Sequence, residues 1–450
     1  MRTEAALPRP VLPVGGTPNR LPMRVTAGLL FVSFLALLIL VATSPRRFLY
    51  DEPFHANNVL LLYQYGLSPR FLKSLPTASG PLYSFVQFVF EPLTRLQPVR
   101  MRLVNVFLLA LVSGILVSSL KRQRQTDHWL AGCSVLIVPM TWVVAGMALS
   151  EMPAIVFVTL SLYLQLRGLA ALEARHPIRG WFLVSGFCLG IAVWGRQPYL
   201  LLCGVPVLVG ILERRLRMAA VIFVGIVLAM AIPLFIIWNG LVPPDSQDLV
   251  LLGISVPHGL LSLGYAGICF FLIAPEFRRL PLKVLFGLLM LTITANAWSD
   301  FLVSYPIQSL ADRYFPASML SLYGSLSGSL LLSCGVVFLA ALLRMIWLDR
   351  KDLRRVTITA GLLCIAIAPM FDTFQYSSRY TAMSLPYLIM AAPAWRRWRL
   401  ETPITAAFGC VLGFLSLLGY FSGNQRTPPT ATTQSVRAMT EQIFPYAQSE

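Results

Sequence analysis

The sequence has too little charge for a water-soluble protein. Only 12% of its 450 residues are charged and 56% are hydrophobic, whereas soluble domains average about 25% charged and about 45–50% apolar residues. The mean hydropathy is +0.70, and apolar runs of roughly 20 residues, the length that crosses a bilayer, recur along the chain. The composition excludes a soluble fold and predicts an all-α, polytopic membrane protein.

The sequence also lacks the motifs of a disulfide framework, a metal centre or a nucleotide site. Its seven cysteines all fall within apolar runs, and no cysteine–histidine cluster has metal-ligand spacing. There is no glycine-rich phosphate loop and no N-glycosylation sequon. We therefore expect neither a metal ion nor a cofactor.

Thirteen apolar runs are candidates for transmembrane helices, within a range of 11 to 14, because several runs are shorter than about 20 residues. These runs cover residues 25–43, 101–120, 129–149, 152–166, 181–194, 199–212, 218–238, 249–274, 284–298, 320–346, 356–371, 380–394 and 403–421. The predicted organisation is a disordered cytoplasmic tail over 1–24, a membrane domain over 25–421, and a polar outer tail over 422–450.

The basic residues predict the orientation. With the N-terminus in the cytoplasm, 24 of the 36 lysines and arginines lie in cytoplasmic segments. This excess alternates in phase with the spans, as the positive-inside rule expects. The net charge of +17 therefore reports topology, and we expect membrane lipids rather than nucleic acid as partners.

The first outer segment, residues 44–100, is far longer than any cytoplasmic connection between spans. It is amphipathic, and residues 53–65 and 82–90 predict short helices lying at the membrane surface. A long ordered loop in a compact membrane protein is usually functional.

The outer side also gathers the polar side chains that could carry chemistry. The candidates are Asp51, Glu52, His55, Glu151, Arg196, Gln197, Asp245, His258, Arg313, Tyr314, Arg379 and Tyr380. Carboxylates and guanidinium groups at one lipid boundary predict an anionic, lipid-linked substrate with a reacting hydroxyl.

Each candidate also has a structural interpretation. The two acids of the first loop and Glu151 stand where acids cap helix N-termini. Arginines at a membrane boundary, here Arg196, Arg313 and Arg379, can snorkel or anchor lipid phosphates, and His55 can be a hydrogen-bonded interfacial histidine. The order of the motifs along the chain and their common location on the outer side of the membrane favour a functional site more strongly than any single residue does.

In that order the chain resembles the GT-C superfamily of membrane glycosyltransferases. Within it, the chain is most similar to the dolichyl-phosphate-glucose-dependent α-1,2-glucosyltransferases. The resemblance runs from about Tyr50 to Pro386 and rests on Asp51-Glu52-Pro53-Phe54-His55, Gly80-Pro81-Leu82-Tyr83, Arg102-Leu103-Val104-Asn105, Ser150-Glu151, Gly195-Arg196-Gln197, Asn239-Gly240 with Asp245 and His258, Ala311-Asp312-Arg313-Tyr314, and Arg379-Tyr380 with Pro386.

The resemblance implies a GT-C-like fold and a hexosyltransferase. Such an enzyme moves a hexose, glucose in this family, from a polyprenyl-phosphate donor to a hydroxyl of a lipid-linked glycan or another acceptor. The transfer is metal-independent and inverts the anomeric centre. It takes place on the non-cytoplasmic face of a bacterial inner membrane or an endoplasmic reticulum membrane, and we expect a monomer.

The resemblance also distributes roles. It places the catalytic base at Asp51, with Glu52 the close competitor, since adjacent residues at a helix start cannot both face one point. Arg196, with Arg313 or Arg379, would bind the donor phosphate. The other implied substrate-binding residues are His55 and Glu151, which would position acceptor hydroxyls or the base, and Gln197, Asp245, His258, Tyr314 and Tyr380.

Three rival interpretations stay open. A polyprenyl-linked glycan ligase or polymerase handles the same kind of donor, but such proteins typically carry their large outer loop late in the chain. A lipid-linked sugar transporter would place ionisable groups near the bilayer midplane and would show an internal repeat. A non-catalytic scaffold leaves the coincidence of motifs unexplained.

Overall fold

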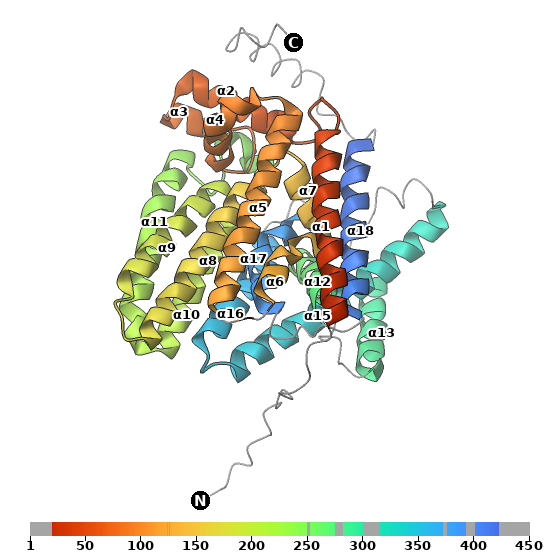
Figure 1. Cartoon of the computed structure of the whole chain (residues 1–450). Coiled ribbons are helices and arrows are strands. Elements are labelled where there is room, and N and C mark those ends of the chain that lie inside the picture. The colour runs from red at the N-terminus through yellow and green to blue at the C-terminus, as the bar shows by residue number, and fades with distance from the viewer. Residues whose placement is uncertain are drawn as a thin grey trace, which may run out of the picture.

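The computed structural model describes residues 20–123, 125, 127–249, 253–274, 282–299, 315–371, 376–392 and 401–422. Over these residues every regular element is a helix, which confirms the all-α prediction. Figure 1 shows the long helices running side by side, with the short helices of the first loop gathered at one end. The predicted tails lie almost entirely outside the described residues.

Among the described residues, eight helical segments are long and apolar enough to cross a membrane, which makes this a polytopic membrane protein. They are α1 (Arg20–Ala42), α5 (Pro98–Arg122), α8 (Glu151–Glu173), α11 (Arg217–Trp238), α12 (Val256–Ile273), α15 (Ala317–Leu348), α16 (Leu353–Ile367) together with the 3₁₀ helix η6 (Ala368–Phe371), and α18 (Glu401–Ser422). Their outer faces carry exposed apolar side chains such as Phe31, Ile236 and Ile404, as expected for surfaces that contact lipid.

The prediction of about 13 spans is not confirmed, since the described residues hold eight, or nine if one bent pair is a single span. That pair covers the predicted span 129–149 and is bent by 78°. It consists of α6 (His128–Cys133) and the 3₁₀ helix η1 (Ser134–Ile137), then α7 (Pro139–Gly146). The bend falls where α7 begins at Pro139, a residue whose ring disfavours continuation of a preceding helix.

Other predicted spans are short helices in the structure. Residues 181–194 lie in α9 (Arg179–Gly195), and residues 199–212 are divided between η2 (Gln197–Cys203) and α10 (Gly204–Leu212). Residues 380–394 are likewise divided, over their described part, between η7 (Ser378–Ser384) and α17 (Leu385–Ala391). The longest of these helices, α9, has 17 residues and rises about 26 Å, less than the roughly 30 Å of a hydrocarbon core.

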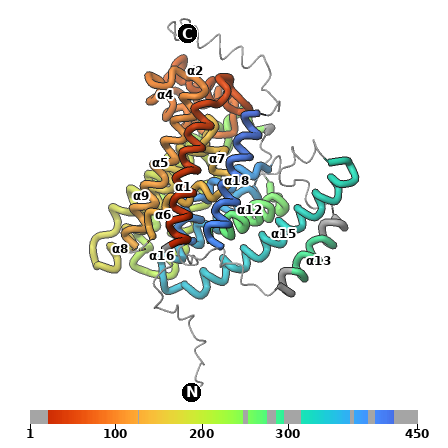
Figure 2. Tube along the Cα trace, turned by 45° about the vertical axis from the view of Figure 1, so that its right-hand side comes forward, coloured from red at the N-terminus to blue at the C-terminus, as the bar shows by residue number. Residues whose placement is uncertain are grey.

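Further helices flank or extend the spans. The 3₁₀ helices η3 (Arg214–Leu216) and η4 (Pro244–Leu249) flank α11, and η6 (Ala368–Phe371) follows α16. The helix α13 (Leu282–Ser299) covers the predicted span 284–298, and it packs on α15. Figure 2 shows α13 and α15 leaning away from the other helices.

The first loop folds into α2 (Glu52–Tyr65), α3 (Pro69–Lys73) and α4 (Leu82–Thr94). The helix α4 is amphipathic as predicted, and it buries polar residues while Phe88, Val89 and Leu93 are exposed. That apolar outer face suits a membrane surface. The helix α2 differs from the prediction, because nine of its 14 residues are buried.

The loop is pinned to the end of α9 by Gly80. Its backbone N–H donates to the carbonyl of Gly195 at 3.3 Å, and a Cβ at Gly80 would lie 2.0 Å from the backbone oxygen of Trp194. Only glycine permits so close an approach. Since α9 packs between α8 and α11, this contact holds the first loop over the ends of three helices.

Candidate active site

The acids of the first loop have different surroundings although they are adjacent. Glu52 is fully buried, and its two carboxylate oxygens accept four hydrogen bonds. Arg102 of α5 donates two of them, at 2.8 and 2.6 Å. The backbone N–H groups of Leu49 and Ala148 donate the others, at 2.8 and 2.9 Å. The carboxylate of Glu52 therefore has all its acceptor directions occupied by the protein.

Arg102 ties the start of the first loop to the core. This fully buried guanidinium also donates to Ser44 Oγ at 2.8 Å and to the carbonyls of Pro45 and Arg47 at 2.6 and 2.9 Å. Arg102 and Glu52 together fix the backbone on both sides of Tyr50. Tyr50 has a positive φ of 52°, a left-handed conformation that is uncommon for a bulky residue.

Asp51 faces away from that ion pair. It stands at the N-cap of α2 but makes no capping hydrogen bond, so the helix-cap interpretation does not describe it. Its carboxylate pairs with Arg379 Nη2 at 2.8 Å. The side chain of Asp51 is 42% exposed, so an incoming molecule can reach it.

Glu151 lies between two arginines. It is the first residue of α8 and is fully buried. One carboxylate oxygen contacts Arg196, which directly follows α9, and lies 3.5 Å from Nε of Arg379 in η7. Four segments distant in sequence thus bring Asp51, Glu151, Arg196 and Arg379 into one group, which we call the ion-pair cluster.

The ion-pair cluster and the neighbouring His55 carry polar atoms with no hydrogen-bond partner among the described residues. They are His55 Nδ1, Glu151 Oε2, Arg196 Nε and Arg379 Nε, all of them buried. Buried polar atoms are nearly always satisfied in folded proteins. Unpartnered donors and acceptors that converge on one place are typical of a site that binds a polar ligand.

Electrostatics set the protonation of the cluster. Burial raises the pKa of Asp51, but Arg379, and more weakly His55 and Arg196, outweigh burial and hold that pKa below its ordinary value. Burial alone would lower the pKa of Arg379, whereas the Glu151 and Asp51 carboxylates raise it above the ordinary value. At neutral pH Asp51 is therefore a carboxylate and Arg379 a guanidinium ion.

His55 adds a neutral ring to this group. Burial lowers the pKa of His55 to about 4, although the Asp51 and Glu151 carboxylates act in the opposite direction. The ring packs against Tyr83, with 5.1 Å between ring centroids. Neutral His55 can hydrogen-bond to a hydroxyl without adding charge.

Three further predicted residues, Gln197, Tyr380 and His258, make contacts outside the ion-pair cluster. Gln197 donates to the carbonyl of Ala78 at 3.0 Å and so supports the first loop. Tyr380 meets Tyr376 edge-on, and Tyr376 in turn lies 5.8 Å from the ring of His258. These aromatic residues extend the site away from Arg379.

Two groups of predicted residues do not join the cluster. Asp245 is exposed in η4, and no ion pair or hydrogen bond connects it to the cluster within the described ranges. Arg313 and Tyr314 lie outside the described residues.

Sequence reasoning assigned no role to Arg102 and did not single out Tyr376. A lone arginine at the start of an otherwise apolar run was the available signal for Arg102, because a buried cation needs a counter-charge. Its partner, Glu52, is 50 residues away, so no local spacing reveals the pair. Tyr376 becomes notable only through its ring contacts with Tyr265 and Tyr380.

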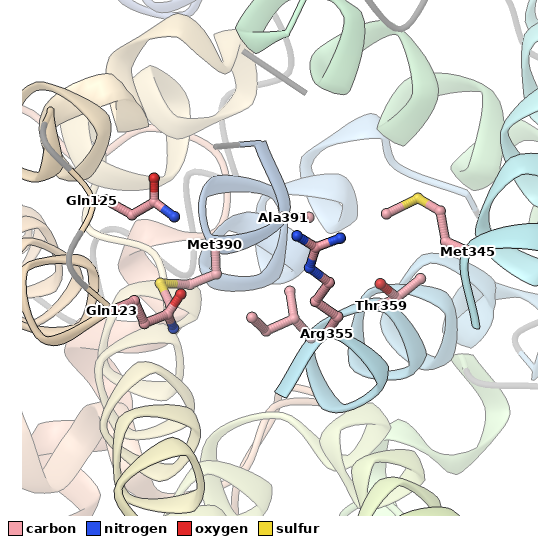
Figure 3. A pocket seen from close by; sticks show the side chains of 8 residues that line it. Gln123, Gln125, Met345, Arg355, Thr359, Met390 and Ala391 are labelled. Carbon is pink, nitrogen blue, oxygen red and sulfur yellow. The ribbon is translucent and has the colours of Figure 1, made fainter. Parts of the chain in front are cut away.

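A small cavity of about 70 Å³ lies elsewhere, near the C-terminal end of α5. Figure 3 shows Gln123, Arg355 and Met390 among the side chains that line it. None of the cluster residues lines this cavity.

The fold and the site together define a polytopic membrane protein, helical over its described residues, with a partly buried ion-pair cluster at one end of its helices. No protein-family profile and no curated protein matches the sequence.

Two similar solved structures are of ArnT from Cupriavidus metallidurans. In the form bound to undecaprenyl phosphate, ArnT is 16% identical, and the match covers 89% of this chain and 77% of ArnT at a TM-score of 0.40. In the apo state it is 17% identical, with 93% and 76% covered and a TM-score of 0.39. Similarity this low does not show a family.

Proposed function

We propose that this protein is a membrane glycosyltransferase of the GT-C superfamily. In this proposal it moves a hexose, with glucose the first candidate, from a polyprenyl-phosphate donor to a hydroxyl of a lipid-linked glycan on the non-cytoplasmic face of its membrane. The proposal rests on one observation above all: Arg379 contacts both Asp51 and Glu151, and Arg196 contacts Glu151.

The two arginines provide the phosphate site in this proposal. Glu151, buried between them, holds both guanidinium groups in place. Arg196 and Arg379 each keep an Nε atom without a hydrogen-bond partner among the described residues. Planar guanidinium groups suit phosphate oxygens, and charge-assisted hydrogen bonds of this kind are strong.

Asp51 is the proposed catalytic base. It is accessible and makes no capping bond, whereas Glu52 is enclosed and saturated with four hydrogen bonds. A general base must reach the proton that it abstracts. The surroundings of the two acids therefore favour Asp51 as base and give Glu52 a positioning role through Arg102.

The proposed reaction is a single displacement at the anomeric carbon. The acceptor oxygen forms a bond to that carbon while the bond to the phosphate oxygen breaks. The acceptor proton moves to Asp51, and the polyprenyl phosphate leaves with its charge held by Arg196 and Arg379. When Arg379 turns from Asp51 toward the phosphate, the pKa of Asp51 rises because its counter-charge is shared.

The position of the cluster favours an enzyme over a transporter. Glu151 begins a membrane span, Arg196 follows α9, and Asp51 precedes the first-loop helix α2. The group therefore lies at helix ends, whereas transporters place their ionisable sites near the bilayer midplane between broken helices.

Purified protein in detergent tests the proposal when it is incubated with radiolabelled polyprenyl-phosphate glucose or mannose and a glycolipid acceptor. We expect label to move to the acceptor from at least one donor. Asp51→Asn should abolish transfer, and the matched control Glu173→Gln, on an exposed ion pair with Arg354, should leave it unchanged. Transfer at the wild-type rate by Asp51→Asn would remove Asp51 as the base.

A further inference from the structure

A basic hollow lies at the opposite end of α8 from the ion-pair cluster. It has a volume of about 480 Å³, and its basic lining residues are Arg175, His176, Arg179 and Arg215. Leu172 and Ile178 add an apolar part to the lining. The α8 helix has 23 residues, and at about 1.5 Å per residue it separates the hollow from Glu151 by roughly 34 Å.

Among the described residues, no acidic side chain pairs with the arginines of the hollow. No ion pair joins Arg175, Arg179 or Arg215 to an acid in the part of the chain that the structure describes. The nearby Glu173 is engaged by Arg354 at 2.5 Å. The carboxylate of Glu213 accepts the backbone N–H of Arg215 at 3.1 Å.

The hollow is built on ordered backbone. Arg175 has a positive φ of 59°, and its N–H donates to the carbonyl of Leu172 at 3.0 Å. The N–H of His176 donates to the carbonyl of Ala171 at 2.8 Å. The 17-residue helix α9 begins at Arg179, so the positive end of its dipole lies at the same place.

Neighbouring residues place the hollow at the level of lipid headgroups. Trp181 lies one turn or less beyond Arg179 and stacks under the guanidinium of Arg167 at 4.7 Å. Tryptophan is enriched at the membrane–water boundary. Leu183 and Met218, on the first turns of α9 and α11, are exposed as lipid-facing residues are.

We propose that this hollow binds the phosphate of an anionic phospholipid headgroup, in the leaflet opposite the candidate active site. The three arginines supply the charge, the apolar lining meets the start of the acyl chains, and the imidazole of His176 adds a polar contact. A basic pocket between spans is suited to anionic headgroups. This binding is independent of the proposed enzymatic function.

Native mass spectrometry of the full chain in detergent, titrated with phosphatidylglycerol, cardiolipin or phosphatidylcholine, tests the proposal. We compare the wild type with the triple variant Arg175→Gln, Arg179→Gln and Arg215→Gln. The matched control, Lys121→Gln, Arg344→Gln and Lys351→Gln, removes the same charge from exposed residues near the same end of the helices.

Each arginine near a lipid surface strengthens binding of an anionic lipid about fivefold, so the triple variant should bind on the order of a hundredfold more weakly. The control residues do not line the hollow, and charges more than a Debye length from the bound headgroup are largely screened, so the control should stay within about twofold of the wild type. Equal losses in both triple variants would mean diffuse attraction and would overturn the site, as would equal binding of phosphatidylcholine by the wild type.

A single variant and a competition with inorganic phosphate complete the experiment. Where the triple variant does not yield folded protein, the single variant Arg175→Gln, in an exposed turn, should show the fivefold loss by itself, and no loss there would overturn the proposal. Millimolar inorganic phosphate should not displace the bound lipid. Displacement by phosphate would reassign the hollow to a free anion.

Discussion

The ion pair between Glu52 and Arg102 yields the sharpest stability prediction. Glu52→Gln preserves the shape of the side chain but removes its charge, so the guanidinium of Arg102 stays buried without a counter-charge. Both side chains are fully buried, and Arg102 lies 2.6 Å from the carboxylate. Breaking one partner of a buried ion pair costs about 3–5 kcal/mol.

Two features place the loss of stability near the lower limit of this range. Arg102 keeps its bonds to Ser44, Pro45 and Arg47 in the variant, and the new amide can still accept hydrogen bonds through its oxygen. We therefore expect Glu52→Gln to lower the free energy of unfolding by about 3 kcal/mol. The exposed pair of Glu173 with Arg354 provides the control, because Glu173→Gln should cost less than about 1 kcal/mol.

Thermal unfolding of the purified protein in detergent, followed by tryptophan fluorescence, measures the difference. We expect the midpoint of Glu52→Gln to fall by roughly 3–6 °C relative to Glu173→Gln, since the shift per kcal/mol is small for a long chain. Adding Arg102→Gln should recover part of the loss, because the uncompensated charge is then gone.

Glycosyl-transfer activity distinguishes a positioning role for Glu52 from a catalytic role for Asp51. Glu52→Gln should retain measurable glycosyl transfer at a temperature where it is folded, whereas Asp51→Asn should retain none. Two results would refute the reasoning: a midpoint for Glu52→Gln equal to that of the control, or a stable Glu52→Gln protein without activity beside an active Asp51→Asn protein.

Three further predictions concern the cluster. Arg379→Gln should raise the KM for the polyprenyl-phosphate donor roughly tenfold to a hundredfold in steady-state assays, as expected for lost hydrogen bonds to a charged group, with partial recovery in Arg379→Lys. The same Arg379→Gln change should move the acid limb of the kcat/KM profile, which reports the free enzyme, to higher pH, because the pKa of Asp51 is then no longer held down by its main counter-charge; an unmoved limb would remove Asp51 as the titrating group. The pKa of His55 is about 4 in the folded protein and about 6.5 in the unfolded chain. Because only the unfolded state takes up the proton between these pH values, the free energy of unfolding should fall by up to about 3 kcal/mol as the pH drops from about 6.5 to about 4. Melting curves of His55→Gln should lack that part of the decline.

The sequence predicted the class of fold well but not the number of spans. Low charge and long apolar runs require a lipid environment whatever the tertiary structure, which is why the all-helical, polytopic prediction is confirmed. Apolar runs of about 14 residues, such as 181–194 and 199–212, cannot be assigned by composition alone. Whether they cross the membrane or stay short depends on breaks such as the 3₁₀ helix η2 before α10.

The sequence also predicted which residues could form a site. Asp51, Glu151, Arg196 and Arg379 stood out because charged side chains at the ends of apolar helices require a partner or a function. Their roles stay proposals, but the structure places all four in contact within one cluster. Asp245 could not be excluded beforehand, since an exposed acid and a site acid look alike in sequence.

The sequence by itself determined that this protein is embedded in a membrane and has a small set of charged residues at the ends of its helices. Both properties depend only on composition and on the local order of residues along the chain. Only the tertiary structure decided that Glu52 turns inward to Arg102 while Asp51 turns outward to Arg379. Adjacent residues share the same local sequence, so their different surroundings come from partners 50 and more than 300 residues away. Such long-range pairings arise when helices pack, and no spacing within the first loop encodes them.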